Sequence, residues 1–194
     1  MKLSLIVPCY NEAENVAEFQ AAVISAFDSC GYDYEIVFVD DGSKDATLHN
    51  LRKLHARQEC PVKVVSFSRN FGKEAGLYAG LQHASGEYIS LIDADLQQRP
   101  EIVRDMVEIL DENPETDVVA AYQDRRSEGK VLSFFKKSFY AIINKLSKVQ
   151  LQPDASDFRT FRRSVAESIL KLGEYHRFSK GIFAWVGYET KFIP

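Results

Sequence analysis

Two carboxylates two residues apart are the strongest chemical signal in the chain. Asp93 and Asp95 follow the apolar, β-prone run 88–92, and Gln97 comes two residues later. Residues i and i+2 of an extended chain point the same way, so both carboxylates would lie together at the carboxyl end of a buried strand, the edge at which open α/β sheets bind ligands. Such a pair suits a divalent cation that also binds substrate phosphates. Alternatively, the two residues only form a turn or cap the next helix.

Short apolar runs alternate with amphipathic segments, and this alternation predicts how the carboxylates are positioned. We expect buried strands over residues 3–7, 34–39, 62–67, 88–92 and 117–121. Helices are expected between them, the first opened by a capping box of Asn11 and Glu14, the second capped by Ser43, and the fourth beginning at Pro100. The pattern predicts an α/β fold, with a Rossmann-like, mostly parallel sheet and helices on both faces.

Four of the predicted strands run into polar loops. These loops cover residues 8–12, 40–43, 68–73 and 93–97. Because the carboxyl ends of parallel strands meet at one edge of a sheet, the loops are predicted to converge there. Taken singly, residues 40–43 could be a plain turn with a helix cap, and Lys73 could be a solvated residue at the start of a helix.

Composition limits the classes of function. The chain has 194 residues, 45% hydrophobic residues and a net charge of −4, which fits one globular domain and argues against a nucleic-acid binder. The three cysteines lack metal-ligand spacing and indicate reduced thiols in the cytoplasm. No signal peptide is recognisable, and no run approaches the ~18 apolar residues of a membrane span. We therefore expect a soluble, cytoplasmic segment, and the apolar ending at 192–194 suggests a fragment of a longer polypeptide.

The second half of the chain has a different pattern. Apolar residues recur at helical spacing over 131–149, and four lysines lie among them, at positions 136, 137, 145 and 148. This basic amphipathic helix could lie on an anionic membrane surface or could be a core helix with a solvated lysine face. A further helix is expected near 163–172, before an aromatic and basic stretch at 176–185, in which Arg177 could simply form a cation–π pair.

The polar loops carry a recognisable series of motifs. They read Pro-Cys-Tyr-Asn-Glu at 8–12, Asp-Asp-Gly-Ser at 40–43, Ser-Arg-Asn-Phe-Gly-Lys at 68–73 and Asp-Ala-Asp-Leu-Gln at 93–97. In this order they resemble the motifs of family 2 glycosyltransferases with the GT-A fold. Residues 157–159 and 177–185 are similar to later motifs of the branch that makes polyprenyl-phosphate-linked sugars, which includes dolichyl-phosphate mannose synthases and bactoprenol glucosyltransferases.

The resemblance implies a division of the chain. Residues 1–194 would form a single GT-A catalytic domain, with a nucleotide-sugar-binding half at 1–123 and an acceptor half at 124–194 that contains the basic amphipathic helix. Family members usually continue into membrane-spanning helices, so the resemblance implies a fragment of a longer, membrane-attached chain.

The resemblance also implies a role for each motif residue. The nucleotide-sugar donor would be bound by Pro8, Tyr10, Asn11, Glu12, Asp40, Asp41, Lys73, Ala94 and Gln97. A Mg²⁺ or Mn²⁺ ion would be held by Asp93, Asp95 and Gln97. The catalytic residues would be Asp93, Asp95 and Asp157, of which Asp157 matches the position proposed as catalytic base. The acceptor phosphate would be bound by Arg125, Arg126, Arg159, Arg177 and Lys180. Either Arg125 or Arg126 would supply the arginine that follows the fifth strand in this branch.

The implied activity is an inverting transfer of a sugar from a nucleotide donor to a polyprenyl phosphate. UDP-glucose is the favoured donor and GDP-mannose the next, and the reaction would take place at the inner face of the cytoplasmic membrane. Two alternatives stay open: a glycosyltransferase that uses a saccharide or protein hydroxyl as acceptor, and a non-catalytic module that binds nucleotide sugars or docks on a membrane. The sequence predicts no oligomeric state.

Overall fold

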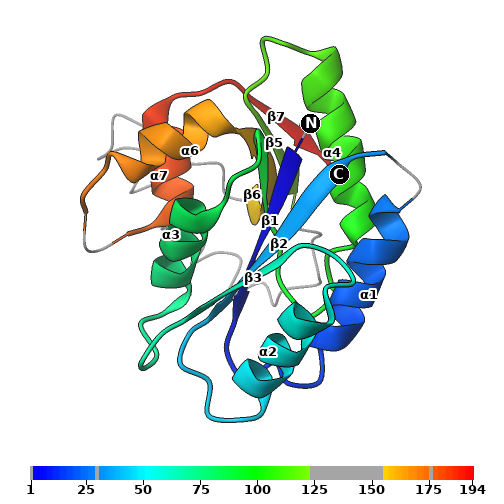
Figure 1. The fold of residues 1–194 in the computed structure, drawn as a ribbon. Coiled ribbons are helices and arrows are strands. Elements are labelled where there is room, and N and C mark those ends of the chain that lie inside the picture. Colours follow the sequence, from blue (N-terminus) through cyan, green and yellow to red (C-terminus); the bar gives the residue numbers. More distant parts are fainter. Residues whose placement is uncertain (1, 29–30, 123–154, 175–176) are drawn as a thin grey trace, which may run out of the picture.

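A computed structural model describes residues 2–28, 31–122, 155–174 and 177–194 (Figure 1). Its strands are β1 (Lys2–Cys9), β2 (Asp33–Asp40), β3 (Val62–Ser66), β4 (Tyr88–Leu91), β5 (Val118–Tyr122), β6 (Ala155–Arg162) and β7 (Thr190–Ile193). Its helices are α1 (Val16–Phe27), α2 (Thr47–Arg57), α3 (Lys73–His83), α4 (Pro100–Glu112), α6 (Arg163–Leu170) and α7 (Ser179–Val186). The predicted α/β fold is therefore confirmed.

The strands of the described residues form one sheet in the order β3-β2-β1-β4-β6-β5-β7. Strands β3, β2, β1 and β4 are parallel, whereas β6 pairs antiparallel with both β4 and β5. Arg159 of β6 pairs with Leu91 at the end of β4, so the residues that precede Arg159 lie at the carboxyl edge of the parallel strands. A strand from the second half of the chain thus lies inside the sheet of the first half.

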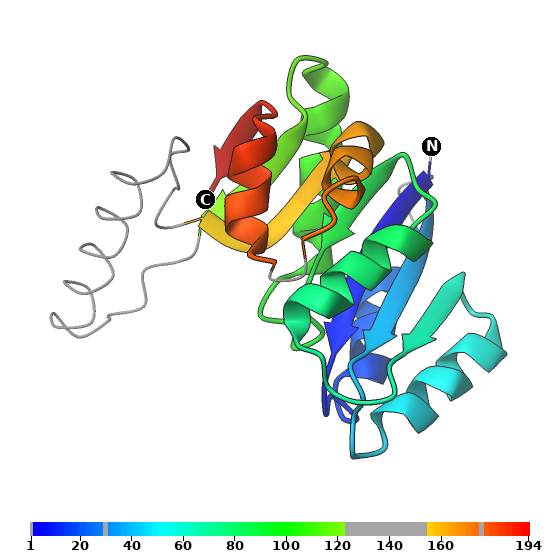
Figure 2. The same ribbon diagram turned by 90° about the vertical axis from the view of Figure 1, so that its left-hand side faces the viewer.

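Helices cover both faces of the sheet, because β1 is apolar on both of its faces. Leu3, Leu5 and Val7 pack into a core with α1, α2 and α4, while Ile6 packs into the opposite core with α3, α6 and α7. Figure 2 shows α3, α6 and α7 together on one side of the sheet. Such burial on both faces is expected for a central parallel strand.

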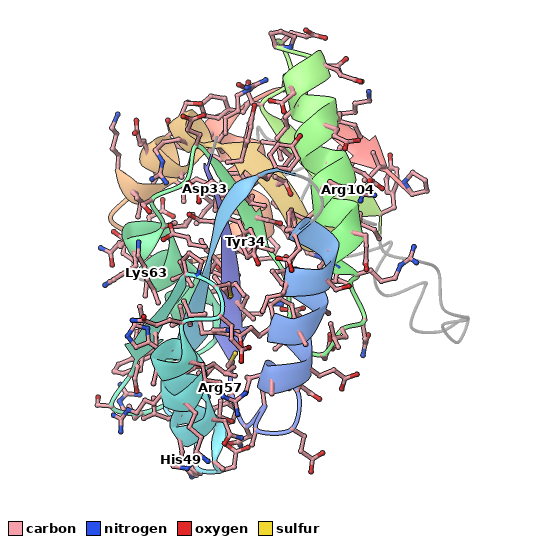
Figure 3. The ribbon with its side chains drawn as sticks, turned by 45° about the vertical axis from the view of Figure 1, so that its right-hand side comes forward. Asp33, Tyr34, His49, Arg57, Lys63 and Arg104 are labelled. Carbon is pink, nitrogen blue, oxygen red and sulfur yellow. The ribbon has the colours of Figure 1, made fainter. Side chains whose placement is uncertain are left out.

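The two edges of the sheet differ in what they carry. In Figure 3, Asp33 marks the amino end of β2 and His49, near the start of α2, lies at the opposite end of the molecule. The loops that follow β1, β2, β3 and β4 all lie at the carboxyl edge, as predicted from their order in the chain.

Two predicted helix caps are wrong. Helix α1 begins at Val16, and the carbonyl of Glu12 accepts the N–H groups of Asn15 and Val16 in a turn, so Asn11 and Glu14 form no capping box. Helix α2 begins at Thr47 rather than after Ser43. The hydroxyl of Ser43 instead accepts the N–H of Asn11, 3.0 Å away, and joins the loops that follow β1 and β2.

Several predictions fall on residues that the structure does not describe. The basic amphipathic helix at 131–149, Arg125 and Arg126 lie outside the described residues. Within the described residues, no helix combines the length and apolarity that a membrane crossing requires.

Candidate functional site

The side chains of Asp93, Lys73 and Asp157 meet at the carboxyl edge of the sheet. The ammonium of Lys73 lies 2.7 and 3.0 Å from the two carboxylate oxygens of Asp93 and 3.8 Å from Oδ2 of Asp157. The side chains are 43%, 36% and 35% exposed for Lys73, Asp93 and Asp157, so a ligand can reach them. This cluster joins the start of α3, the loop after β4 and the start of β6.

Asp41 fixes the loop that leads to Lys73. Its carboxylate is buried and accepts the N–H groups of Phe71 and Gly72, at 2.7 and 2.8 Å. The neighbouring Gly42 has a φ of +64°, and a Cβ there would lie 2.3 Å from the carbonyl carbon of Arg69. Only glycine allows so close an approach of two backbones. Asp41, which the motif comparison assigned to donor binding, thus holds the loop from which α3 starts.

Arg159 supports the backbone on which Asp157 lies. Its side chain is 4% exposed and donates hydrogen bonds to the carbonyls of Ser156, at 2.7 Å, and Asp157, at 3.3 Å. The guanidinium also lies 4.3 Å from the ring centroid of Phe183 in α7. Burial lowers the pKa of Arg159 to about 10, against the opposing effect of Asp157 and Glu74, so the group stays charged at neutral pH.

The loop after β4 is a turn, so the extended arrangement predicted for the two aspartates is wrong. Strand β4 ends at Leu91, and Leu96 has a φ of +57°. The N–H of Asp93 donates to Oε1 of Gln98, at 3.0 Å, and the N–H of Gln97 donates to Oδ1 of Asp95, at 3.1 Å. Ala94 is buried beneath the turn, whereas Asp95 and Gln97 are exposed.

The residues of this turn fit a hard divalent cation. Asp93, Asp95 and the side-chain amide of Gln97 offer only oxygen to a cation, and Asp93 is already balanced by the positive charge of Lys73. Among the described residues, no three or more His, Cys, Asp and Glu side chains gather as a complete ligand set. Mg²⁺ and similar ions commonly use one or two carboxylates and complete their shell with water and phosphate oxygens.

The loops after β1 and β2 form a second, adjoining part of the edge. The side-chain oxygen of Asn11 accepts the N–H of Lys44, at 2.9 Å, and the N–H of Glu12 donates to the hydroxyl of Thr47, at 2.8 Å. Pro8 pairs with Val39 in the ladder that leads to these loops. Hydrogen bonds between the loops therefore fix their relative positions.

Two residues of this part differ sharply in exposure. The ring of Tyr10 is exposed, whereas the carboxylate of Asp40 is buried and accepts the N–H of Ser43 and the hydroxyl of Ser66, each at 3.3 Å. Nearby Cys9 is a buried free thiol whose pKa is raised by burial and then by Glu12, Asp40 and Asp93.

Arg177 and Lys180 lie at the start of α7. The guanidinium of Arg177 donates to the carbonyl of Leu172, at 2.9 Å, and lies 4.4 Å from the ring centroid of Tyr78. The cation–π pair considered for Arg177 is therefore present, and its role in binding the acceptor phosphate stays a prediction. Lys180 lies in the first turn of α7. Glu74, which the motifs did not single out, accepts the N–H of Ser179, at 3.0 Å, and its hydroxyl as well. Its position directly after Lys73 is the one signal that could have indicated it.

Comparison with known proteins agrees with this geometry. Residues 4–170 match the family model described as glycosyl transferase family 2. The chain is 39% identical over 193 residues to a bactoprenol glucosyl transferase of Shigella phage SfV, and the match covers 100% of this chain and 62% of the relative. The chain spans about three fifths of the length of the curated relatives it matches.

Solved structures show the same fold. The S. aureus TarS structure in complex with UDP is 22% identical, with a TM-score of 0.66 over 100% of this chain and 58% of that chain. The mannosyltransferase PcManGT from Pyrobaculum calidifontis, in complex with GDP-Man and Mn²⁺, is 22% identical, with a TM-score of 0.67 over 99% of this chain and 54% of that chain. The predicted GT-A fold is confirmed by this likeness, and the chain belongs to glycosyl transferase family 2.

Proposed function

We propose that this protein is an inverting glycosyltransferase that moves a sugar from a nucleotide-sugar donor to a polyprenyl phosphate. The observation that supports this most directly is the placement of Asp157 beside Asp93 and Lys73, because a transferase needs its donor and acceptor groups at one point. The bactoprenol glucosyl transferase relative supports the lipid acceptor and favours UDP-glucose over GDP-mannose as donor.

The donor would lie across the loops after β1, β2 and β4. Tyr10 offers an exposed ring for the base. We assign Glu12 and Asp40 to the ribose hydroxyls from the motif resemblance. Asp93, Asp95 and Gln97 would hold Mg²⁺ or Mn²⁺ on the diphosphate, and the bound cation would supply Lewis-acid stabilisation of the leaving group's negative charge. The complexes of TarS with UDP and of PcManGT with GDP-Man and Mn²⁺ support this arrangement.

The acceptor's chemistry determines what Asp157 has to do. A phosphate monoester, with a second pKa near ~6, is largely dianionic at neutral pH, so it needs orientation more than deprotonation. We therefore assign Asp157 to orienting the acceptor or taking a residual proton. The acceptor phosphate is assigned to four cations of the second half, Arg125, Arg126, Arg177 and Lys180, and Arg159 is given an indirect role. Because Arg159 is buried, it would act by holding the start of β6 in place.

A radiolabelled-donor assay tests the proposal. Purified protein is incubated with UDP-[¹⁴C]glucose or GDP-[¹⁴C]mannose, Mn²⁺ and extracted polyprenyl phosphate in detergent, and then partitioned between butanol and water. We expect label in the lipid phase, its loss with EDTA and its loss in Asp93→Ala. Label that enters only water-soluble saccharides would identify a hydroxyl acceptor instead. Neither transfer nor hydrolysis, with donor binding intact, would identify a non-catalytic module.

A further inference from the structure

The ammonium of Lys73 lies on Asp93, one of the three residues proposed to hold the metal ion. Its ammonium contacts both oxygens of Asp93, at 2.7 and 3.0 Å, and approaches Asp157 to 3.8 Å. The three side chains are partly exposed and come from three different elements. Lys73 therefore neutralises Asp93 and draws the loop after β4 and the start of β6 toward α3.

Hydrogen bonds fix the backbone on both sides of Lys73, whereas its side chain is long and can change conformation. Asp41 binds the N–H groups of Phe71 and Gly72 just before it, and Glu74 just after it binds the start of α7 through Ser179. Lysine carries its charge on a flexible four-carbon stem with rotatable donors. The ammonium can therefore leave Asp93 and reach another anion nearby without any movement of α3.

We infer that Lys73 is an internal counter-ion that competes with the divalent cation for Asp93 and is released when the donor's diphosphate arrives. This inference rests on the proposed function. A metal ion on Asp93 and an ammonium 2.7 Å from the same carboxylate repel each other, so one lowers the occupancy of the other. The diphosphate offers the ammonium an alternative anion at the same edge and so frees Asp93 for the metal.

Two measurable consequences follow. The free protein binds Mn²⁺ weakly, because binding must first displace Lys73 from Asp93. Mn²⁺ and the nucleoside diphosphate each strengthen the binding of the other, and by linkage the effect is the same in both directions. Part of this coupling arises from Lys73 and the remainder from direct contact between the metal and the diphosphate.

Calorimetric titration of Mn²⁺ into the metal-free protein tests the competition. In Lys73→Met we expect Mn²⁺ alone to bind about two- to tenfold more tightly than in the wild type, the range of one or two exposed ion pairs. Lys73→Arg keeps the charge and should match the wild type. Lys44→Met removes a positive charge from the neighbouring loop after β2 and serves as the matched control, with unchanged affinity.

The same titrations in the presence of UDP, and separately of GDP, measure the coupling. We expect the gain in Mn²⁺ affinity caused by the diphosphate to be smaller in Lys73→Met than in the wild type. Unchanged or weaker Mn²⁺ binding by Lys73→Met, or equal tightening in Lys44→Met, would overturn the inference. If Lys73→Met gives such a result but Asp95→Asn loses Mn²⁺ binding, the role of Lys73 is overturned and the proposed function still stands. If Asp95→Asn binds Mn²⁺ as the wild type does, both the metal assignment and the role of Lys73 are overturned.

Discussion

Charged side chains in the loops of this protein either face a ligand or hold the backbone in place, and the residue type alone does not show which. Asp93 and Asp157 are exposed to ligand, whereas Asp41 and Arg159 are buried and hold backbone groups. The motif order correctly predicted that these residues gather at one edge. It could not predict which carboxylate accepts backbone N–H groups, because that depends on how closely the loops after β2 and β3 approach each other.

Replacing Asp41 by Asn should destabilise the fold. One of the two N–H groups that Asp41 satisfies would face an amide NH₂ rather than an oxygen, and we expect a loss of about 1–3 kcal/mol in the free energy of unfolding. Urea denaturation followed by circular dichroism measures it. Asp105→Asn, on the exposed side of α4, is the control and should change stability by less than about 0.5 kcal/mol. Equal stability of the two variants would rule out the structural role of Asp41.

Asp93 and Asp157 should differ in their effect on catalysis. We expect Asp93→Ala to lower the transfer rate about 10²–10³-fold, since the diphosphate's charge would no longer be balanced. Asp157→Asn should lower it only about tenfold, because a dianionic phosphate acceptor needs little deprotonation and the amide can still orient it. Initial rates of lipid-linked product at saturating donor compare the two. A larger loss in Asp157→Asn would favour a hydroxyl acceptor that requires a true base.

At the scale of elements, hydrophobic periodicity predicted the first five strands well and failed for β6 and α7. Strand β6 carries Arg159 and Arg162 in buried or half-buried positions, so its sequence does not read as a core strand. Arg162 is accommodated because it donates to the carbonyls of Thr116 and Leu110, at 3.0 and 2.6 Å. Helix α7 spans only Ser179–Val186, too short for a clear periodic signal.

The packing of α3 against β1 gives an element-scale prediction with a control in the same helix. A Cβ at Gly80 would lie 2.2 Å from Cγ2 of Ile6, while a Cβ at Gly76 would lie 3.5 Å from Pro8, an ordinary contact. We expect Gly80→Ala to destabilise the fold by about 1–3 kcal/mol through overpacking. Gly76→Ala should be neutral or stabilise it by up to about 1 kcal/mol, because alanine favours helix more than glycine. Thermal unfolding compares them, and destabilisation by Gly76→Ala alone would contradict this packing.

At the scale of the whole molecule, the edge of the sheet opposite the candidate site is held by a buried carboxylate. Glu35 of β2 accepts hydrogen bonds from Ser4 of β1, at 2.6 Å, and from Ser85 before β4, and it pairs with Lys63 of β3 at 2.9 Å. The network thus connects four neighbouring segments of the parallel sheet at their amino ends. This stabilising network and the candidate site thus lie at opposite edges of the sheet.

The Glu35 network predicts how stability depends on pH. Burial alone would raise its pKa, but the hydrogen bonds from Ser4, Ser85 and Lys63 lower the pKa to about 2, from an ordinary 4.5. A lowered carboxyl pKa stabilises the fold fully above pH 4.5, and this contribution is lost as the pH falls toward 2. Glu35→Gln should therefore cost about 2–3 kcal/mol at pH 7 and little near pH 2.

Urea titrations of both proteins at several pH values check this prediction. The exposed Glu108→Gln on α4 provides the control and should show no such pH-dependent difference. UDP affinity of Glu35→Gln should equal that of the wild type at pH 7, since the substitution lies at the far edge. A stability difference that grows as the pH falls would contradict the lowered pKa.

The antiparallel insertion of β6 has a consequence for biosynthesis. The ribosome releases β4 and β5 well before residues 155–162. Until β6 is made, the backbone groups of β4 and β5 that pair with β6 therefore have no partner strand. Asp157 arrives on that same partner. Synthesis of β6 thus joins β5 to β4 and brings Asp157 to Asp93 and Lys73 in one event, and a polypeptide truncated before β6 would be both aggregation-prone and chemically incomplete.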